Sequence, residues 1–303
     1  MRVGVTGSSG FIGTALVRAL HQRGDVVTRF VRPESASGDS SVVRWDPSRQ
    51  LVDESDLARV AGFDAVFHLA GAGIAERRWS EARKKVLVDS RVDSTRLLVQ
   101  ALRSLPSGTL TLASGSAIGF YGSRGDEWLD ERSTPGDDFL SGLCTRWEDA
   151  ASALGDQGTV VTALRTGIVL DQTGGALKRQ LPLFRLGLGG QLATGRQWLS
   201  PISLNDHVRA LLWVIEKRIA GPVNLVCPTP LTNKDFTKIL ASALHRRAFL
   251  TVPSTALRLA LGSQLANEAV LASQRVVPQV LADGGFLFNQ PDARSIIEAA
   301  TLL

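Results

Sequence analysis

Residues 2–20 read RVGVTGSSGFIGTALVRAL. The apolar run at 2–6 predicts a short buried strand. From residue 11 to residue 23 apolar side chains recur at four-residue steps, which predicts an amphipathic helix with one face formed by Ile12, Leu16 and Leu20. Gly7 and Gly10 lie between the strand and the helix, and Gly13 lies in the first turn of the helix. The stretch therefore predicts a strand, a tight glycine loop and a helix in direct succession.

The glycine loop spaces its glycines by three and three residues, at Gly7, Gly10 and Gly13. Gly7 allows a tight turn, Gly10 lets the backbone approach a pyrophosphate, and Gly13 lets the helix pack closely on the sheet. The free N–H groups and partial positive charge of a helix N-terminus attract phosphate oxygens. We therefore expect a dinucleotide phosphate to contact Gly7, Ser8, Ser9, Gly10, Phe11, Ile12 and Gly13.

Strand and helix patterns alternate through the first half of the chain. Such alternation is typical of a parallel sheet covered by helices on both faces. The predicted fold class is therefore α/β, a Rossmann-type doubly wound parallel sheet. Further strands are expected at 26–31, 42–45, 64–69, 109–114 and 159–165. Helices are expected at 55–61, capped by Ser55, at 80–105 and at 139–154.

The pattern changes after residue 165, where glycine pairs bracket a helix that Pro182 should break. We expect a nucleotide-binding domain at 1–168 and a smaller C-terminal α/β substrate domain at 169–303. The segment 203–227 is expected to return to the first domain. Capped helices are expected at 203–217 and 232–244, and strands at 223–227 and 248–252.

The 303 residues carry 34 Lys and Arg against 29 Asp and Glu, a formal net charge of +5. The basic residues are scattered, which favours a small anionic ligand over a nucleic acid. Cys144 and Cys227 are too few for a disulfide framework, and no His, Asp or Glu spacing indicates a metal site. No apolar run approaches the roughly 20 residues that span a bilayer, and no signal peptide is visible. We expect a cytoplasmic monomer or homodimer with neither nucleic-acid nor membrane partners.

Further motifs accompany the glycine loop and its preceding Thr6. His68-Leu69-Ala70-Gly71 follows the predicted fourth strand, and SGSAIGFYG at 114–122 follows the fifth. Together these motifs resemble the extended short-chain dehydrogenase/reductase superfamily, which implies a nicotinamide cofactor. The chain also resembles an atypical branch of it, the epimerase family proteins, also described as nucleoside-diphosphate-sugar epimerase-like. The segments that carry this second resemblance are Arg78-Trp79, Asp89–Arg91, Trp147-Glu148, Gly195–Trp198 and Gly221–Asn224.

The end of the second strand distinguishes NAD from NADP in such folds. An acidic residue there binds the ribose 2′-hydroxyl of NAD, whereas an arginine accepts the 2′-phosphate of NADP. Arg29 and Arg32 stand there with no acid before Glu34, so we expect NADP(H); two solvated arginines are the alternative. Ser114 is also expected to touch the cofactor. The resemblance adds contacts from His68, Leu69, Ala70, Gly71, Lys85 and Arg91. For Lys85, a solvated helix face is the alternative.

The resemblance also implies a serine and a Tyr-x-x-x-Lys pair, in which the lysine lowers the tyrosine pKa. The only tyrosine, Tyr121, has no lysine four residues later, and Leu140 and Cys144 fall at the positions of the pair. Ser116 aligns with the superfamily serine that hydrogen-bonds a substrate carbonyl. Tyr121 follows on a loop at the carboxyl edge of the sheet, where ligands bind, so we expect it to donate a proton. A ring that packs in the core is the alternative.

On the substrate side, Arg196 and Trp198 offer a charge and a stacking surface, with a turn and an interface tryptophan as the alternative. We therefore predict an NADP(H)-dependent oxidoreductase or epimerase-like enzyme acting on a small carbonyl or carbinol substrate. Ser116 and Tyr121 are its expected catalytic residues. The missing Tyr-x-x-x-Lys pair keeps a second hypothesis open, a non-enzymatic NADP(H)-sensing or partner-binding module on the same fold.

Overall fold

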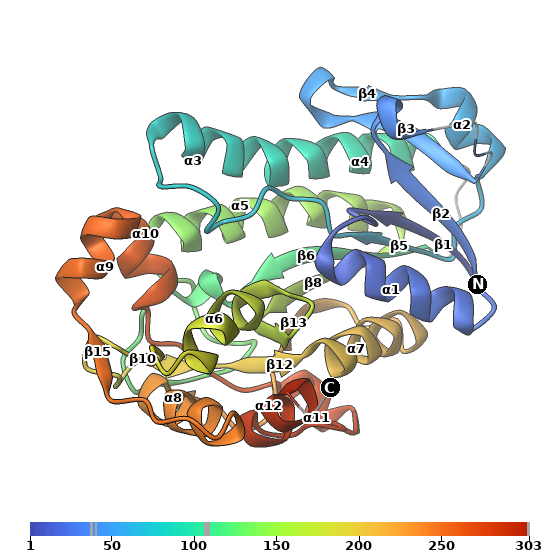
Figure 1. Ribbon diagram of the computed structural model, residues 1–303. Helices are drawn as coiled ribbons and strands as arrows, with labels where there is room; N and C mark the ends of the chain where they lie inside the picture. Colours follow the sequence, from blue (N-terminus) through green and yellow to red (C-terminus); the bar gives the residue numbers. More distant parts are fainter. Residues whose placement is uncertain (37–38, 40, 106–109, 302–303) are drawn as a thin grey trace.

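The computed structural model describes residues 1–36, 39, 41–105 and 110–301. Its centre is an eight-stranded sheet in the order β13-β8-β6-β5-β1-β2-β3-β4 (Figure 1). Neighbouring strands are parallel except β3 and β4. The predicted Rossmann-type α/β sheet is therefore confirmed. The strands are β1 (Arg2–Thr6), β2 (Val26–Val31), β3 (Val42–Asp46), β4 (Leu51–Val52), β5 (Ala65–His68), β6 (Thr111–Ala117), β8 (Val160–Thr166) and β13 (Gly221–Leu225).

Alternate side chains of the strands pack into two separate cores, one on each face of the sheet. Val5 and Phe67 share one core with α1 (Phe11–Gln22) and α7 (Leu204–Glu216). Val66, the neighbour of Phe67, shares the other core with Leu98 and Leu112. Figure 1 shows α1 and α7 on one side of the sheet and three helices from the first half of the chain on the other. Those helices are α3 (Glu81–Val88), α4 (Ser94–Arg103) and α5 (Phe139–Ser152).

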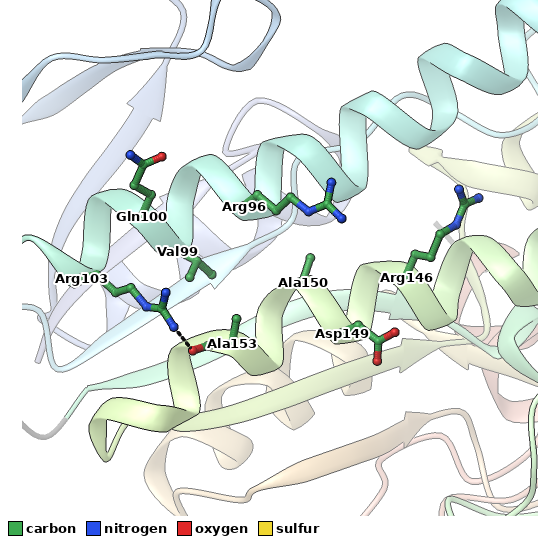
Figure 2. Close-up of a pocket in the computed structure, with 8 residues that line it drawn as sticks. All are labelled: Arg96, Val99, Gln100, Arg103, Arg146, Asp149, Ala150 and Ala153. Carbon is green, nitrogen blue, oxygen red and sulfur yellow. Dashed lines mark hydrogen bonds between the residues drawn. The ribbon is translucent and has the colours of Figure 1, made fainter.

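A cavity of about 400 Å³ lies between α4 and α5 (Figure 2). Three arginines approach it, and Arg103 closes one end by donating to the carbonyl oxygen of Ala153 at 2.5 Å. None of the residues predicted to bind cofactor or substrate lines it. The lining consists of Arg96, Val99, Gln100, Arg103, Arg146, Asp149, Ala150 and Ala153.

Three predicted helices differ from those observed. α2 (Glu54–Arg59) begins one residue earlier than predicted, because Asp53 and not Ser55 accepts from the N–H of Asp56. The helix predicted at 80–105 contains a π-turn, Asp89–Asp93, between α3 and α4. Pro182 does not break α6 (Gly175–Arg185), which continues one turn beyond it. The predicted start of the fifth strand at 109 lies outside the described residues.

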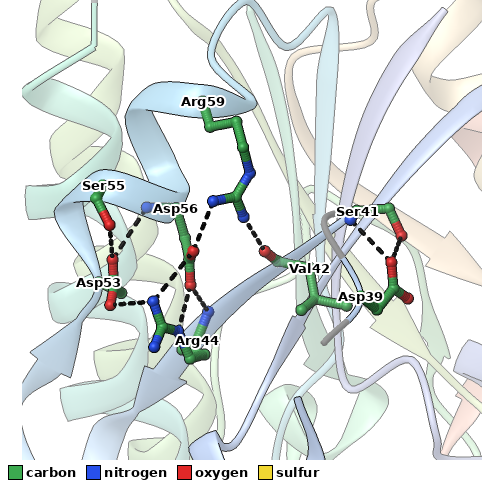
Figure 3. Close-up of polar contacts among 8 residues, drawn as sticks. All are labelled: Asp39, Ser41, Val42, Arg44, Asp53, Ser55, Asp56 and Arg59. Atoms are coloured by element: carbon green, nitrogen blue, oxygen red, sulfur yellow. Dashed lines mark hydrogen bonds and ion pairs between the residues drawn. The ribbon is translucent and has the colours of Figure 1, made fainter. Parts of the chain in front are cut away.

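Asp56 anchors the edge of the sheet at β3 (Figure 3). Its buried carboxylate accepts from Arg44 Nε at 2.6 Å and pairs with Arg59 Nη1 at 2.9 Å. Hydrogen bonds from Arg44 outweigh desolvation and lower the pKa of Asp56 to about 2. This carboxylate therefore stays ionised in the folded protein and ties α2 to β3.

The C-terminal part of the chain forms its own core of buried side chains, which includes Leu177, Phe236 and Ile297. β13 nevertheless pairs with β8 in the large sheet, and α7 packs on the same face as α1. The domain limits stay a prediction. The elements outside the large sheet are β7 (Trp128–Leu129), β9 (Ile168–Asp171), β10 (Gly190–Leu192), β11 (Trp198–Leu199), β12 (Pro201–Ser203), β14 (Leu231–Thr232), α8 (Asn233–Ala243), β15 (Leu250–Val252), α9 (Ser254–Leu261), α10 (Ser263–Leu265), β16 (Arg275–Val276), α11 (Gln279–Asp283) and α12 (Ala293–Thr301).

Within the described ranges, no helix has the length and apolar character needed to cross a membrane.

Candidate functional site

The glycine loop between β1 and α1 leaves no room for side chains at two of its glycines. Gly7 has φ +66°, and a Cβ there would lie 2.7 Å from the carbonyl carbon of Leu69. A Cβ on Gly13 would overlap the carbonyl oxygen of Gly7 and lie 2.9 Å from Ser8 Cα. Gly10 is the N-cap of α1; no side chain caps this helix and its first turn holds no acid. The free N–H groups of α1 are therefore available to phosphate oxygens.

Thr6 connects the glycine loop to the segment that follows β5. Its Oγ1 accepts from the N–H of Leu69 at 3.1 Å and of Ala70 at 3.2 Å. The same oxygen lies 2.8 Å from His68 Nδ1, so the Thr6 hydroxyl donates to that nitrogen. His68 is fully buried, and desolvation lowers its pKa to about 3. Its imidazole is therefore a neutral support beneath the loop and does not reach a ligand itself.

The two arginines predicted to hold a 2′-phosphate have different surroundings. Arg29 pairs with Asp39, whose Oδ2 lies 2.8 Å from Arg29 Nη2. Figure 3 shows the other oxygen of Asp39 bound by Ser41. Arg32 is exposed after β2, and no ion pair joins it to another described residue. Of the two arginines, Arg32 is therefore the one whose guanidinium is more available to bind a 2′-phosphate. The sequence analysis did not identify Asp39 as the partner of Arg29.

Arg91 and Lys85 also differ in environment. Lys85 is exposed and pairs with Asp89 Oδ2 at 2.6 Å. Arg91 is buried in the π-turn, where Nη2 donates to the carbonyl oxygen of Ala72 at 2.9 Å and the guanidinium lies 5.1 Å from the Trp147 ring. Desolvation lowers the pKa of Arg91 to about 10, and no carboxylate of the described ranges pairs with it. A buried cation without a carboxylate partner, beside the loop after β5, suits an anionic ligand.

Ser116 stands at the carboxyl end of β6 and is nearly buried. Its Oγ donates to Glu148 Oε1 at 2.6 Å. Glu148 on α5 is held in turn by Arg165 on β8, whose Nε and Nη2 donate at 2.9 and 2.8 Å. β6 and β8 place Ser116 directly opposite Arg165. The sequence analysis named Glu148 only within a segment that carries the family resemblance. Its pairing with Arg165 depends on the order of the strands. Two positions before Ser116, Ser114 has a buried hydroxyl with no partner among the described residues.

The structure corrects the predicted position of Tyr121. The side chain is fully buried and does not face a crevice. Its hydroxyl donates to Asn224 Oδ1 at 2.7 Å and accepts from Arg165 Nη1 at 3.1 Å. Burial raises the pKa of this phenol to about 12. Tyr121 therefore matches the alternative, a ring that packs in the core and whose hydroxyl has hydrogen-bond partners. We no longer propose that Tyr121 donates a proton to a substrate.

The positions of the superfamily tyrosine and lysine are filled by packing residues. Leu140 and Cys144 are both buried, and desolvation raises the pKa of the Cys144 thiol to about 12. The N–H of Leu140 donates to Glu268 Oε2 at 3.1 Å, which caps the first turn of α5 from a distant part of the chain. Neither residue replaces the missing acid–base pair.

Trp198 is held in a stack of side chains with Arg275 and Trp128. The Arg275 guanidinium lies 3.9 Å from the Trp198 ring and 3.7 Å from the Trp128 ring, between the two. Trp198 Nε1 donates to Asp126 Oδ1 at 2.7 Å. The alternative of an interface tryptophan therefore describes its packing. Arg196 is exposed in the preceding turn and makes no ion pair within the described ranges.

Comparison with known proteins gives the family. The model of the NAD dependent epimerase/dehydratase family matches residues 3–139, and that of a domain of unknown function, DUF1731, matches residues 252–300. The chain is 42% identical over 288 residues to epimerase family protein Mb2239 of Mycobacterium bovis, which covers 95% of this chain and 93% of that protein. It is 36% identical over 296 residues to human epimerase family protein SDR39U1, with 96% and 97% covered.

A solved structure of human SDR39U1 (isoform 2) with NADPH superposes with a TM-score of 0.89 at 32% identity. It covers 100% of this chain and 99% of that one. UDP-N-acetylglucosamine 4-epimerase from Bacillus cereus shares the fold with a TM-score of 0.74 at 16% identity, over 100% and 98% of the two chains. The chain therefore belongs to the epimerase family proteins of the extended short-chain dehydrogenase/reductase superfamily.

Proposed function

We propose that the protein binds NADP(H) along the glycine loop and oxidises or reduces a small carbinol or carbonyl substrate at Ser116. Three features support cofactor binding: the open N-terminus of α1, the exposed Arg32 after β2 and the unpaired cation of Arg91. The NADPH-bound relative with the same fold supports the choice of cofactor. When bound, the cofactor supplies or accepts the hydride at nicotinamide C4.

The hydrogen bond from Ser116 to Glu148 carries the mechanistic part of the proposal. A serine hydroxyl has one proton to donate, and Ser116 donates it to a carboxylate at 2.6 Å. The Oγ then faces a substrate only as an acceptor, so it receives a hydrogen bond from a carbinol O–H. During oxidation the substrate proton moves to Ser116 Oγ while the serine proton moves to Glu148. During reduction both protons move in the opposite direction, and the substrate oxygen regains its hydrogen.

Arg165 positions Glu148 for this relay. Its two hydrogen bonds fix both carboxylate oxygens, and its guanidinium stacks 3.5 Å from the Phe120 ring. This clamp keeps Glu148 directed at Ser116 in the absence of substrate. The proposed relay therefore uses Ser116 and Glu148 where related enzymes use tyrosine and lysine.

A panel of alcohols and carbonyl compounds, tested with NADP⁺ and NADPH, measures whether the protein is an enzyme. We expect Ser116→Ala and Glu148→Gln each to lower turnover by about 10²–10⁴-fold, as removal of a positioned acid or base does, with unchanged cofactor affinity. Ser104→Ala, which removes an exposed hydroxyl at the end of α4, serves as the matched control. Full turnover in both site variants would exclude the relay.

The buried Tyr121 and the missing Tyr-x-x-x-Lys pair favour the second candidate, a non-enzymatic NADP(H)-sensing module. It predicts that the wild-type protein binds NADPH but oxidises it with none of the compounds. If the protein binds NADPH but turns over none of the compounds, the result would contradict the enzyme proposal and support the sensor.

A further inference from the structure

Six large apolar side chains protrude from two neighbouring parts of the C-terminal region. Phe249 is 79% exposed, Leu259 78% and Leu186 73%. β10 and β15 pair in parallel, with Gly190 opposite Leu250, which brings the loops that precede these strands together. We name the surface formed by 183–190 and 245–260 the apolar–basic face. Its exposed large apolar residues are Leu183, Leu186, Leu188, Phe249, Leu250 and Leu259.

Helix α9 follows β15 and has no fully buried residue, although Leu257 and Leu261 are half-buried. Its C-terminal end is nevertheless fixed, because Arg78 donates from Nε to the carbonyl oxygen of Ala260 at 2.9 Å and from Nη2 to that of Leu259. Figure 1 shows α9 at the periphery of the molecule, next to β15 and α10. Core packing therefore does not account for Leu259, which is 78% exposed.

Residues 183–190 and 245–260 contain four arginines and no Asp or Glu, and the flanking sequence is also basic. Residues 172–205 and 236–267 contain eight Lys and Arg and no Asp or Glu, whereas the rest of the chain holds 26 basic and all 29 acidic residues. Arg246 Nε donates to the carbonyl oxygen of Arg185 at 2.9 Å, so these two arginines lie side by side. The Arg247 guanidinium lies 5.8 Å above the ring of Phe249. A cationic group therefore lies against the most exposed apolar side chain of the face.

We propose that the apolar–basic face docks on an anionic lipid bilayer. Arginines bind the headgroup phosphates while Phe249, Leu188 and Leu259 enter the boundary with the acyl chains. A nucleic acid offers phosphates but no apolar layer for aliphatic side chains, which favours the bilayer. Only residues 252–260 of the face fall within the DUF1731 match. The face does not depend on the proposed enzymatic function. This proposal replaces the expectation of no membrane partner, which rested on the lack of a spanning segment.

Co-sedimentation of the full chain with vesicles tests the proposal. The vesicles are phosphatidylcholine alone, or phosphatidylcholine with about one-third phosphatidylglycerol. We expect wild type to sediment only with the anionic vesicles, and less at high salt. Phe249→Ser should weaken this binding by about tenfold. Leu287→Ser removes a side chain that is equally exposed, at 78%, but lies outside the face, and it should bind like wild type.

Two outcomes would overturn the lipid proposal. The first is that wild type does not sediment with anionic vesicles, or that Phe249→Ser sediments as well as wild type does. The second is a concentration-dependent dimer, seen by light scattering without lipid, that Phe249→Ser abolishes; this would assign the face to a second copy of the chain. Circular dichroism checks that each variant is folded, which the high exposure of Phe249 and Leu287 leads us to expect.

Discussion

The substitution Tyr121→Phe separates a structural tyrosine from a catalytic one. It removes one oxygen, which donates to Asn224 Oδ1 at 2.7 Å and accepts from Arg165 Nη1 at 3.1 Å. Asn224 is fully buried, so its amide oxygen loses a partner that water cannot replace. A buried polar group left unsatisfied costs about 1–3 kcal/mol. Arg165 keeps its two bonds to Glu148. We therefore expect the free energy of unfolding to fall by about 1–3 kcal/mol, with unchanged NADPH affinity.

Urea unfolding of wild type, Tyr121→Phe and Ser104→Ala measures this loss. Ser104→Ala deletes an exposed hydroxyl that donates to the carbonyl oxygen of Ala101, and it should change stability by less than about 0.5 kcal/mol. The reasoning would be refuted if Tyr121→Phe kept wild-type stability but lost about a hundredfold or more of turnover. That combination of results would show that the Tyr121 hydroxyl acts in catalysis.

The pH dependence of stability independently tests whether the Tyr121 hydroxyl is buried. The folded pKa of Tyr121 is raised to about 12, against an ordinary value of about 10 for an unfolded chain. The folded protein therefore holds the phenol proton more tightly. This contribution to stability is fully present below about pH 10 and is lost as the pH rises from about 10 to 12. Tyr121→Phe should lack this part of the alkaline decline.

Three further predictions concern other parts of the chain. NADPH should bind at least about tenfold more tightly than NADH, which corresponds to about 1.4 kcal/mol, and isothermal titration of Arg32→Ala should show most of this preference lost. Gly13→Ala should lower the free energy of unfolding by about 1–3 kcal/mol or more, because the new Cβ overlaps the glycine loop. Gly142 is a helical glycine with no neighbour within 4 Å, so Gly142→Ala should raise the free energy of unfolding by up to about 1 kcal/mol. The lowered pKa of Asp56, about 2, means that its contribution to stability is present above about pH 4 and lost as the pH falls through about 2; Asp56→Asn should remove that acid-dependent loss in a urea titration.

Local features of the sequence predicted the sheet and the glycine loop well. The loop and the adjacent strand and helix depend on neighbours within about a dozen residues, so spacing alone located them. Tyr121 was misplaced because its burial depends on Arg165 and Asn224, which strand pairing brings from distant positions. The relay partner Glu148 was not assigned a role for the same reason.

Smaller errors had local causes. Ser55 and Asp53 are both good helix caps, and only the backbone geometry shows which of them accepts the N–H of Asp56. Pro182 was expected to end its helix, yet Leu186 still donates its N–H to the carbonyl oxygen of Pro182, which closes one more turn. Such choices between adjacent alternatives depend on hydrogen bonds that composition and periodicity do not specify.

The π-turn at Asp89–Asp93 sets the rotational phase between α3 and α4. A π-turn accommodates one residue more than an α-helical turn, and one residue corresponds to about 100° of rotation around a helix axis. The side chains before the turn are therefore rotated relative to those after it, so no single apolar stripe runs along both helices. Evolution could shorten this segment by one residue only by turning the whole of α3 about its axis. A one-residue deletion within Asp89–Asp93 would therefore give the side chains of α3 a different direction relative to those of α4.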